Sequence, residues 1–184
     1  MSRIVRRVRQ AGTYFVTTHT WQRRKLFSKS EWARIVLEQL LDCRDRGFYK
    51  LHAFVIMPDH LHLLLTPAEN TSLEKAMQMI KGESAHKIKH DFQNRWPVWQ
   101  PGFHDRWMRD AIEYQSRLRY IAENPVSAKL VERAEEYAFS FANAGFRTDI
   151  SQFDERTSGA KAHLSQCADV AAKAATHKTH AAAT

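Results

Sequence analysis

His60 and His62, in the run His60-Leu61-His62, are the most informative side chains of this 184-residue sequence. In a β-strand, side chains two positions apart point to the same face, so both imidazoles could bind one divalent ion while Leu61 faces the other way. Imidazole is a common metal ligand, and a phosphate oxygen or a water could complete the coordination. The pattern alone is weak evidence, because in an arbitrary chain two histidines at a strand end more often bind no metal.

Tyr120 and Asn124 form a second candidate pair, four residues apart in a predicted helix and therefore neighbours on one face. That face is polar, whereas Leu118 and Ile121 are expected in the core. The amide oxygen of Asn124 could give a hard cation a third protein ligand beside the tyrosine hydroxyl. The alternative is that Tyr120 is an amphipathic surface residue and Asn124 only a helix-terminal residue before Pro125.

The elements that must position these side chains follow from apolar periodicity and turn residues. β-Branched and aromatic runs predict strands, and apolar residues at helical spacing predict helices. Pro58-Asp59 should connect two strands as a hairpin or a bulged continuation. The predicted order is β-α-β-β-α-β-α, over residues 14–20, 28–46, 49–57, 60–66, 71–91, 103–109 and 111–124.

The ends of the helices are predicted from capping residues and proline. Three capping pairs are expected: Ser28 with Glu31, Thr71 with Glu74, and Asp110 with Glu113. Pro125 should end the last helix, because the residue before a proline is pushed out of the α region. The strands at residues 49–57 and 60–66 are apolar on both faces near their ends, as expected of central strands.

This order predicts an α+β fold of the ferredoxin-like or RRM-like kind: a four-stranded antiparallel sheet backed by two helices, plus a C-terminal helix that bears Tyr120. We expect one domain over residues 11–146, after a basic arm at residues 1–10. A tail over residues 147–184 should be largely disordered from about residue 159, where the composition turns to alanine, histidine, lysine and threonine.

The composition narrows the class of protein. Hydrophobic residues make up 43% of the chain, which is enough for a real core. No apolar run approaches the ~20 residues that span a bilayer, and no signal-like stretch follows the basic N-terminus. Two cysteines cannot form a disulfide framework for a chain of this length. A soluble, reduced, cytoplasmic protein is expected, with no membrane partner.

The net charge of +8 is concentrated in residues 1–50, which hold 12 basic and 4 acidic residues. Arginine binds phosphate through a planar, bidentate fork, so the two basic clusters are candidate contacts for a polyanion, most commonly nucleic acid. A solvated, solubilising N-terminus explains the charge equally well. The clusters are Arg3, Arg6, Arg7 and Arg9, and then Arg23, Arg24 and Lys25.

Several segments together resemble a known family. Residues 57–65 (MPDHLHLLL) resemble the HUH motif, histidine-hydrophobic-histidine, of single-tyrosine transposases. Residues 120–126 (YIAENPV) resemble the tyrosine helix of its subgroup of REP-associated tyrosine transposases, and residues 99–103 (WQPGF) and 15–18 (FVTT) are also similar. The resemblance spans roughly residues 10–142, and its specificity lies in the joint occurrence and order of the pieces.

The resemblance implies an activity and a set of roles. Members bind palindromic, hairpin-forming single-stranded DNA of the repetitive extragenic type beside a short guide sequence. They cut and rejoin one strand through a 5′-phosphotyrosine, with Mg²⁺ or Mn²⁺ as cofactor. Carried over, Tyr120 becomes the nucleophile, and His60, His62 and Asn124 the metal ligands. A prokaryotic, nucleoid-associated location is implied, and monomer and homodimer both remain open.

DNA contacts are predicted less sharply. Besides the arginines and Lys25 above, Lys81 and Lys87 could touch the phosphate backbone, although a solvated helix face explains them equally well. Unpaired bases could stack on exposed aromatic side chains. The candidates are Trp96, Trp99, Phe103 and Trp107. Asp105-Arg106 stands where many relatives have Asp-His, so no role is assigned there.

Two other functions compete with a transposase. One is a non-catalytic, RRM-like regulator that binds structured DNA or RNA without a metal. The other is a fragment of a replication or conjugation relaxase with the same HUH chemistry, which is disfavoured because such proteins usually carry further domains.

Overall fold

The computed structural model describes residues 12–149 of the chain. The predicted arm at residues 1–10 and most of the predicted tail lie outside the described residues. Three short 3-10 turns supplement the main elements: η1 (Trp21–Arg23), η2 (Leu26–Ser28) and η3 (Ala134–Glu136). The main elements are β1 (Tyr14–His19), α1 (Ser30–Asp45), β2 (Tyr49–Met57), β3 (His60–Pro67), α2 (Leu73–Asp91), β4 (His104–Trp107) and α3 (Ala111–Ser127), in the predicted order.

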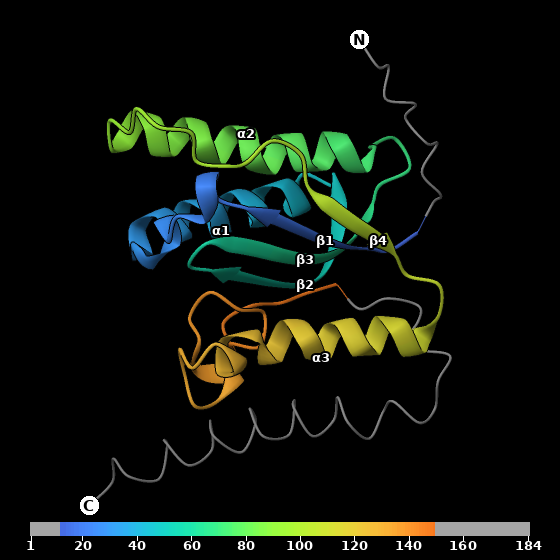
Figure 1. Ribbon diagram of the computed structural model, residues 1–184. Coiled ribbons are helices and arrows are strands. Elements are labelled where there is room, and N and C mark those ends of the chain that lie inside the picture. Colours follow the sequence, from blue (N-terminus) through green and yellow to red (C-terminus); the bar gives the residue numbers. More distant parts are fainter. Residues whose placement is uncertain (1–11, 150–184) are drawn as a thin grey trace, which may run out of the picture. The chain divides into compact units, whose positions relative to one another are not determined.

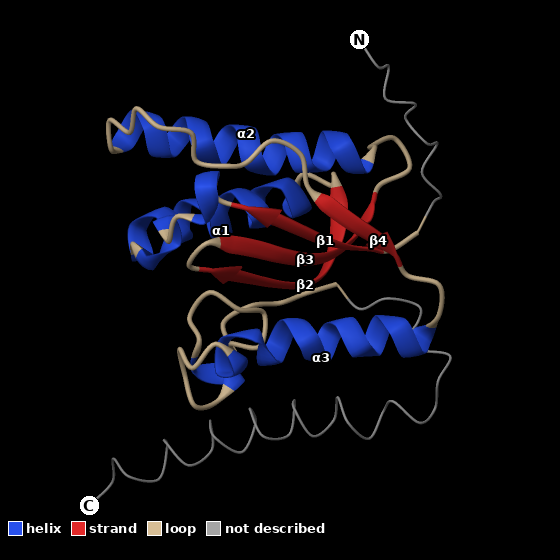
Figure 2. Cartoon of the chain, viewed as in Figure 1, coloured by secondary structure: helices blue, strands red, loops and turns tan. Residues whose placement is uncertain are grey.

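The four strands form one antiparallel sheet in the order β2-β3-β1-β4. Helices α1 and α2 cover one face of the sheet, and α3 lies against the other (Figure 1). Figure 2 shows the same arrangement: the strands lie between one helical layer, formed by α1 and α2, and a second, formed by α3. The predicted α+β, ferredoxin-like class with an added tyrosine-bearing helix is therefore confirmed.

Side chains of β3 point alternately to the two faces of the sheet, so the core residues and the histidines lie on opposite faces. Leu61, Leu63 and Leu65 are fully buried and belong to the core that includes residues of α1 and α2. His60, His62 and Leu64 alternate with them, so their side chains point to the face that α3 covers. The apolar residues of β3 thus decide on which side of the sheet the two histidines lie.

A bulge in β2 keeps this separation along the neighbouring strand. Leu51 pairs with Leu65, whereas Ala53 pairs with Leu64, so the register shifts at His52. A bulge moves the following residues to the other face. Leu51 and Phe54, three positions apart, consequently both join the core.

The prediction that the strand at residues 49–57 is central was wrong. β2 is hydrogen-bonded to β3 alone among the named strands and so lies at an edge of the sheet. Its residues are nevertheless buried, because the chain after α3 returns along it. Ile56 donates to the Phe139 carbonyl at 2.9 Å, and Phe141 donates to the Phe54 carbonyl at 3.0 Å. Covering an edge in this way protects it from pairing with other chains.

The packed chain extends to Asp149. Its backbone nitrogen donates to the Leu51 carbonyl at 2.7 Å, and its carboxylate accepts from the Leu51 nitrogen at 2.7 Å. The strand-edge contacts therefore extend into the first three residues of the predicted tail, 147–149.

Two of the three predicted capping pairs were wrong. Lys29, not Ser28, precedes the first turn of α1 and makes no side-chain cap, because Ser28 is taken up in η2. At α2 the cap is Ser72, which accepts from the Lys75 nitrogen at 3.1 Å, one residue later than expected. Asp110 caps α3 as predicted, accepting from the Glu113 nitrogen at 2.8 Å.

The prediction that Pro125 ends the last helix was also wrong, because α3 runs through it to Ser127. A proline removes the hydrogen bond to the carbonyl four residues earlier and its ring crowds that carbonyl, but only two residues of α3 follow Pro125. Here the ring of Pro125 is buried, and its carbonyl accepts from the Leu130 nitrogen at 2.9 Å. Asn124 consequently sits inside the helix, with a side-chain direction set by helical geometry.

Candidate active site

His60 and His62 lie at the start of β3, where that strand pairs with the end of β1. Their ring centroids are 4.7 Å apart. His62 is 5% exposed and pairs across the sheet with Thr17, while His60 pairs with His19. The strand geometry predicted from the His-Leu-His spacing therefore brings the two imidazoles together.

Each of the two imidazoles has its Nδ1 atom engaged in a hydrogen bond. The Nδ1 of His60 is 2.6 Å from a carboxylate oxygen of Asp59, which can only accept, so this nitrogen carries the proton. The Nδ1 of His62 is 2.8 Å from the hydroxyl of Thr17. A histidine that donates from Nδ1 keeps the lone pair of Nε2 free, which is the tautomer that metal-ligating histidines need.

The protonation state of His62 suits the binding of a cation. Burial, assisted by the neighbouring His60, His19 and Arg117, lowers the pKa of His62 to about 3. The imidazole is therefore neutral at physiological pH and offers a lone pair rather than a positive charge. Neutral imidazole nitrogens of this kind fit a divalent ion.

Tyr120 comes to this pair of histidines from α3. Its hydroxyl lies 3.4 Å from the Nε2 of His62, and the two ring centroids are 5.2 Å apart. The tyrosine side chain is 43% exposed, so a substrate can reach it. The phenol of Tyr120 thus lies beside the imidazole of His62 at a place on the surface that solvent can reach.

Phe15 and Arg117 complete the surroundings of Tyr120, and the sequence reasoning missed both. Phe15 stacks on His62 at 5.3 Å between ring centroids and meets the edge of Tyr120 at 5.8 Å. The guanidinium of Arg117 lies 5.0 Å from the Phe15 ring and 5.9 Å from the Tyr120 ring. Their spacing carried the signal: Phe15 is two residues before Thr17 in β1, and Arg117 is three residues before Tyr120 in α3.

Asn124 lies one helical turn beyond Tyr120 and is partly buried. Its side chain makes no hydrogen bond to any residue in the described part of the chain, so its amide is available to a ligand. Its role as a third metal ligand stays a prediction.

Two further histidines extend the cluster along the end of the sheet. His19 lies 5.7 Å from His60 and 6.3 Å from His104 between ring centroids. Burial and the nearby Arg23 lower the pKa of His19. His19 was not among the predicted site residues, although it stands two residues after Thr17 in the same strand.

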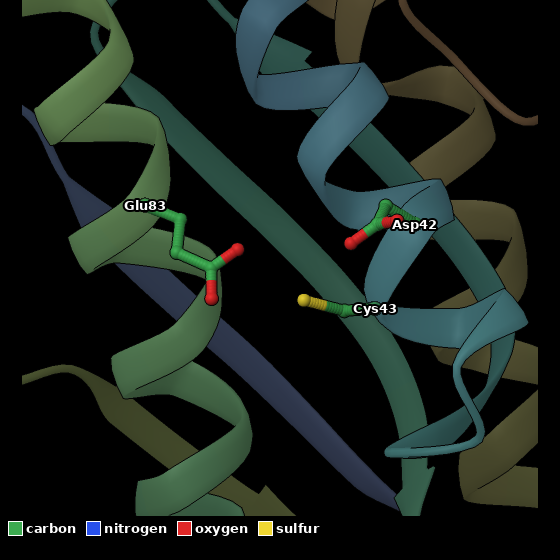
Figure 3. A group of neighbouring side chains, drawn as sticks. All are labelled: Asp42, Cys43 and Glu83. Carbon is green, nitrogen blue, oxygen red and sulfur yellow. The ribbon is translucent and has the colours of Figure 1, made fainter.

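A different group of possible metal donors lies between α1 and α2. Donor atoms of Asp42, Cys43 and Glu83 lie within 4.8 Å of one another, with Glu83 on one helix and the other two on its neighbour (Figure 3). The guanidinium of Arg46 already pairs with the carboxylates of Asp42 at 3.0 Å and Glu83 at 3.7 Å.

Burial raises the pKa of the Cys43 thiol, which disfavours the thiolate that a metal would need. Gln39 adds hydrogen bonds to both the thiol and Glu83. The group is therefore an interhelical polar network, and it lies on the side of the sheet opposite to α3.

The predicted DNA-contact residues divide into three sets. Arg23, Arg24, Lys25 and Lys87 are exposed. The ammonium group of Lys81 instead donates to the backbone carbonyls of Gln100 and Gly102, and burial lowers its pKa to about 8. Arg3, Arg6, Arg7 and Arg9 lie outside the described residues.

A ferredoxin-like sheet with paired histidines facing a helix-borne tyrosine belongs to a class of transposases, and comparison with known proteins identifies the family. Residues 9–124 match the family model described as "Transposase IS200 like", and the chain belongs to this family. It is 27% identical to the REP-associated tyrosine transposase of Escherichia coli K12 over 132 residues, which cover 71% of this chain and 76% of the relative.

One solved structure supports the fold. A REP-associated tyrosine transposase bound to a REP hairpin superposes with a TM-score of 0.63 at 22% identity, covering 83% of this chain and 95% of that one. A transposase-like protein from Deinococcus radiodurans superposes with a TM-score of 0.48 at 24% identity, over 67% of this chain and 97% of that one. Within the described residues, no helix is long and apolar enough to cross a bilayer.

Proposed function

We propose that this protein is a metal-dependent strand transferase that binds hairpin-forming single-stranded DNA and cuts and rejoins one strand through Tyr120. The observation that carries the proposal is the 3.4 Å separation between the Tyr120 hydroxyl and the Nε2 of His62. Family membership supports the transposase activity. A structural neighbour bound to a REP hairpin supports a hairpin as the substrate.

In the cleavage step, the Tyr120 hydroxyl attacks the scissile phosphorus. A bond forms between the phenolic oxygen and phosphorus, and the bond from phosphorus to the 3′-oxygen breaks. The phenol loses its proton and the leaving 3′-oxygen gains one. The products are a 5′-phosphotyrosine and a free 3′-hydroxyl. Because the phosphodiester energy stays in the protein–DNA bond, a second 3′-hydroxyl can reverse the step without ATP.

The residues around Tyr120 take the remaining roles. Mg²⁺ or Mn²⁺, when bound by His60, His62 and Asn124, would polarise the scissile phosphate. Asp59 holds the His60 imidazole in the required tautomer, and we propose that Thr17 accepts from the Nδ1 of His62 to do the same there. Arg117 places a positive charge beside the nucleophile, where negative charge gathers on the phosphoryl oxygens in the transition state.

The test is the formation of a covalent adduct. The full-length protein, incubated with a hairpin-containing single-stranded oligonucleotide and Mn²⁺, should give a protein–DNA band that resists SDS. Tyr120→Phe should bind the hairpin with unchanged affinity and give no such band, because only the attacking oxygen is removed. An adduct that persists in Tyr120→Phe would falsify the assignment of the nucleophile.

A further inference from the structure

A cationic groove lies between the turns that follow β1 and the loop that follows α2. Four cations line it: Arg24, Lys25, Lys29 and Arg95. No acidic side chain of the described residues lines it. The side chains that line the groove therefore do not neutralise its positive charge, which favours an anionic ligand.

Aromatic rings stand among these cations. Trp96 is 64% exposed and Phe92 is 43% exposed. Behind them Trp32 contacts Phe92 at 5.8 Å between ring centroids, and the Lys29 ammonium lies 4.9 Å over the Trp32 ring. Proteins that bind single-stranded nucleic acids combine these two features. The cations contact the phosphates, and the exposed aromatic rings stack on the bases.

Trp32 forms the buried wall of the groove. Trp32 is 5% exposed, and its indole Nε1 has no hydrogen-bond partner among the described residues. Leaving a buried donor unpaired is unfavourable. The Nε1 atom is itself buried, so the part of Trp32 that matters for the groove is its ring, which supports Phe92 from behind.

The loop that bears Trp96 is held in place before any ligand binds. The Asn94 side chain donates to the Trp96 carbonyl at 2.7 Å, and Pro97 restricts the backbone that follows. A ring that is already positioned loses little conformational freedom when a base stacks on it.

Backbone contacts connect the groove to the histidine end of the sheet. Trp21 donates to the Val98 carbonyl at 2.8 Å, and Gln100 donates to the His19 carbonyl at 2.9 Å. The two segments that line the groove thus join each other beside His19, which pairs with His60. The groove lies on the α1–α2 side of the sheet and adjoins the sheet end at which His19 and His60 pair.

We propose that the groove binds an unpaired nucleotide of the substrate DNA, with its base stacked on Trp96 and the flanking phosphates at Arg24 and Arg95. The inference rests on the proposed function, because it extends the path of that same DNA strand. Stacking on an indole tolerates every base, so the groove adds affinity for unpaired DNA and little preference for its sequence.

The test compares two fluorescein-labelled hairpins by anisotropy with the full-length protein. One is blunt, and the other carries an unpaired dT flank of about six nucleotides, within the usual span of a single-strand site. The wild-type protein should bind the flanked hairpin more tightly. Trp96→Ala should remove about tenfold of that advantage, whereas Trp96→Phe should keep most of it, because a phenyl ring still stacks.

Charge variants test the phosphate contacts separately. Arg95→Ala should reduce the slope of log affinity against log salt for the flanked hairpin by about 0.7, the value for one phosphate on a single strand. Lys75→Ala removes the same charge from an exposed position in the first turn of α2, at the far end of that helix, and should leave the slope unchanged.

Two results would overturn the groove proposal: a Trp96→Ala protein that retains the wild-type preference for the flank, or a wild-type protein without that preference. Adduct formation in the same preparations tests the proposed function independently. If the wild-type protein forms the adduct but Trp96→Ala retains the preference, only the groove proposal fails. If flank binding depends on Trp96 but no adduct forms, the strand-transferase function fails and the groove remains.

Discussion

Thr17 shows how a single hydroxyl prepares the candidate active site. Its hydroxyl lies 2.8 Å from the Nδ1 of His62, and where it accepts from this nitrogen, the lone pair of Nε2 faces Tyr120. The adjacent Thr18 has a buried hydroxyl with no hydrogen-bond partner among the described residues. The two neighbouring threonines therefore differ in environment but hardly in chemistry, and they form a matched pair for mutagenesis.

Thr17→Val should weaken Mn²⁺ binding by about 10–100-fold, since this is the usual cost of losing a hydrogen bond that orients a histidine ligand. Isothermal titration with Mn²⁺ measures the change. Thr18→Val, which only replaces an unpaired hydroxyl with a methyl group, should leave the affinity unchanged. Equal Mn²⁺ affinities for the Thr17→Val variant and the wild-type protein would show that Thr17 does not set the tautomer of His62.

Arg117→Ala should slow strand cleavage by about 10²–10³-fold, the typical cost of removing one group that stabilises charge in a transition state. Hairpin affinity should change little, because the loss concerns the reacting phosphate only. Single-turnover cleavage at saturating protein separates the two quantities. Arg119→Ala, at an exposed position of the same helix, is the control. A similar loss of rate in both variants would point to a general charge effect.

At the scale of elements, α3 decides whether Tyr120 reaches the histidines. Strand β3 and helix α3 are far apart in sequence, and the apolar side of α3 holds them together, with Tyr114 and Ile121 buried against the sheet. The polar side of the same helix then presents Tyr120 toward His62. Because α3 extends through Pro125, Asn124 keeps a helical backbone on both sides.

Asp110→Ala should lower the free energy of unfolding by about 1 kcal/mol, because the carboxylate caps the first turn of α3. Urea unfolding followed by circular dichroism measures this change. Ser28→Ala provides the contrast. Ser28 precedes α1 and resembles a cap in the sequence, but α1 is preceded by Lys29, so its substitution should cost almost nothing. Comparable losses in both variants would contradict the observed starts of the helices.

For the molecule as a whole, the excess positive charge and two of the candidate active-site residues lie in different parts of the chain. The net charge of +8 comes from the first 50 residues, whereas Tyr120 and Asn124 come from the second half of the sequence. Electrostatic capture of DNA and the chemical step should therefore be separable by mutation.

Replacing Arg3, Arg6, Arg7 and Arg9 together by alanine tests this separation. If they contact the DNA backbone, the slope of log hairpin affinity against log salt should become shallower by about 0.9 for each phosphate contact that is lost. The single-turnover rate of adduct formation at saturating protein should be unchanged. A salt dependence identical to that of the wild-type protein would show that the arm is only a solubilising segment.

Much of this architecture was accessible from the sequence because it depends on local rules. The period of two in β3 placed His60 and His62 on one face, and helical periodicity separated Tyr120 from Ile121. The errors occurred where tertiary contacts compete with local preference. β2 is buried at an edge because residues 139–149 cover it, and Pro125 stays helical because its ring is buried.

By itself, the sequence determined the element order, the family resemblance and the side chains able to do the chemistry, since periodicity and residue type act within a few positions of the chain. Only the tertiary structure decided that the Tyr120 hydroxyl meets His62, that Thr17 and Arg117 surround this meeting point, and that Trp96 joins Arg24 in one groove. Those juxtapositions depend on packing between segments distant in sequence, and no local pattern encodes such distances.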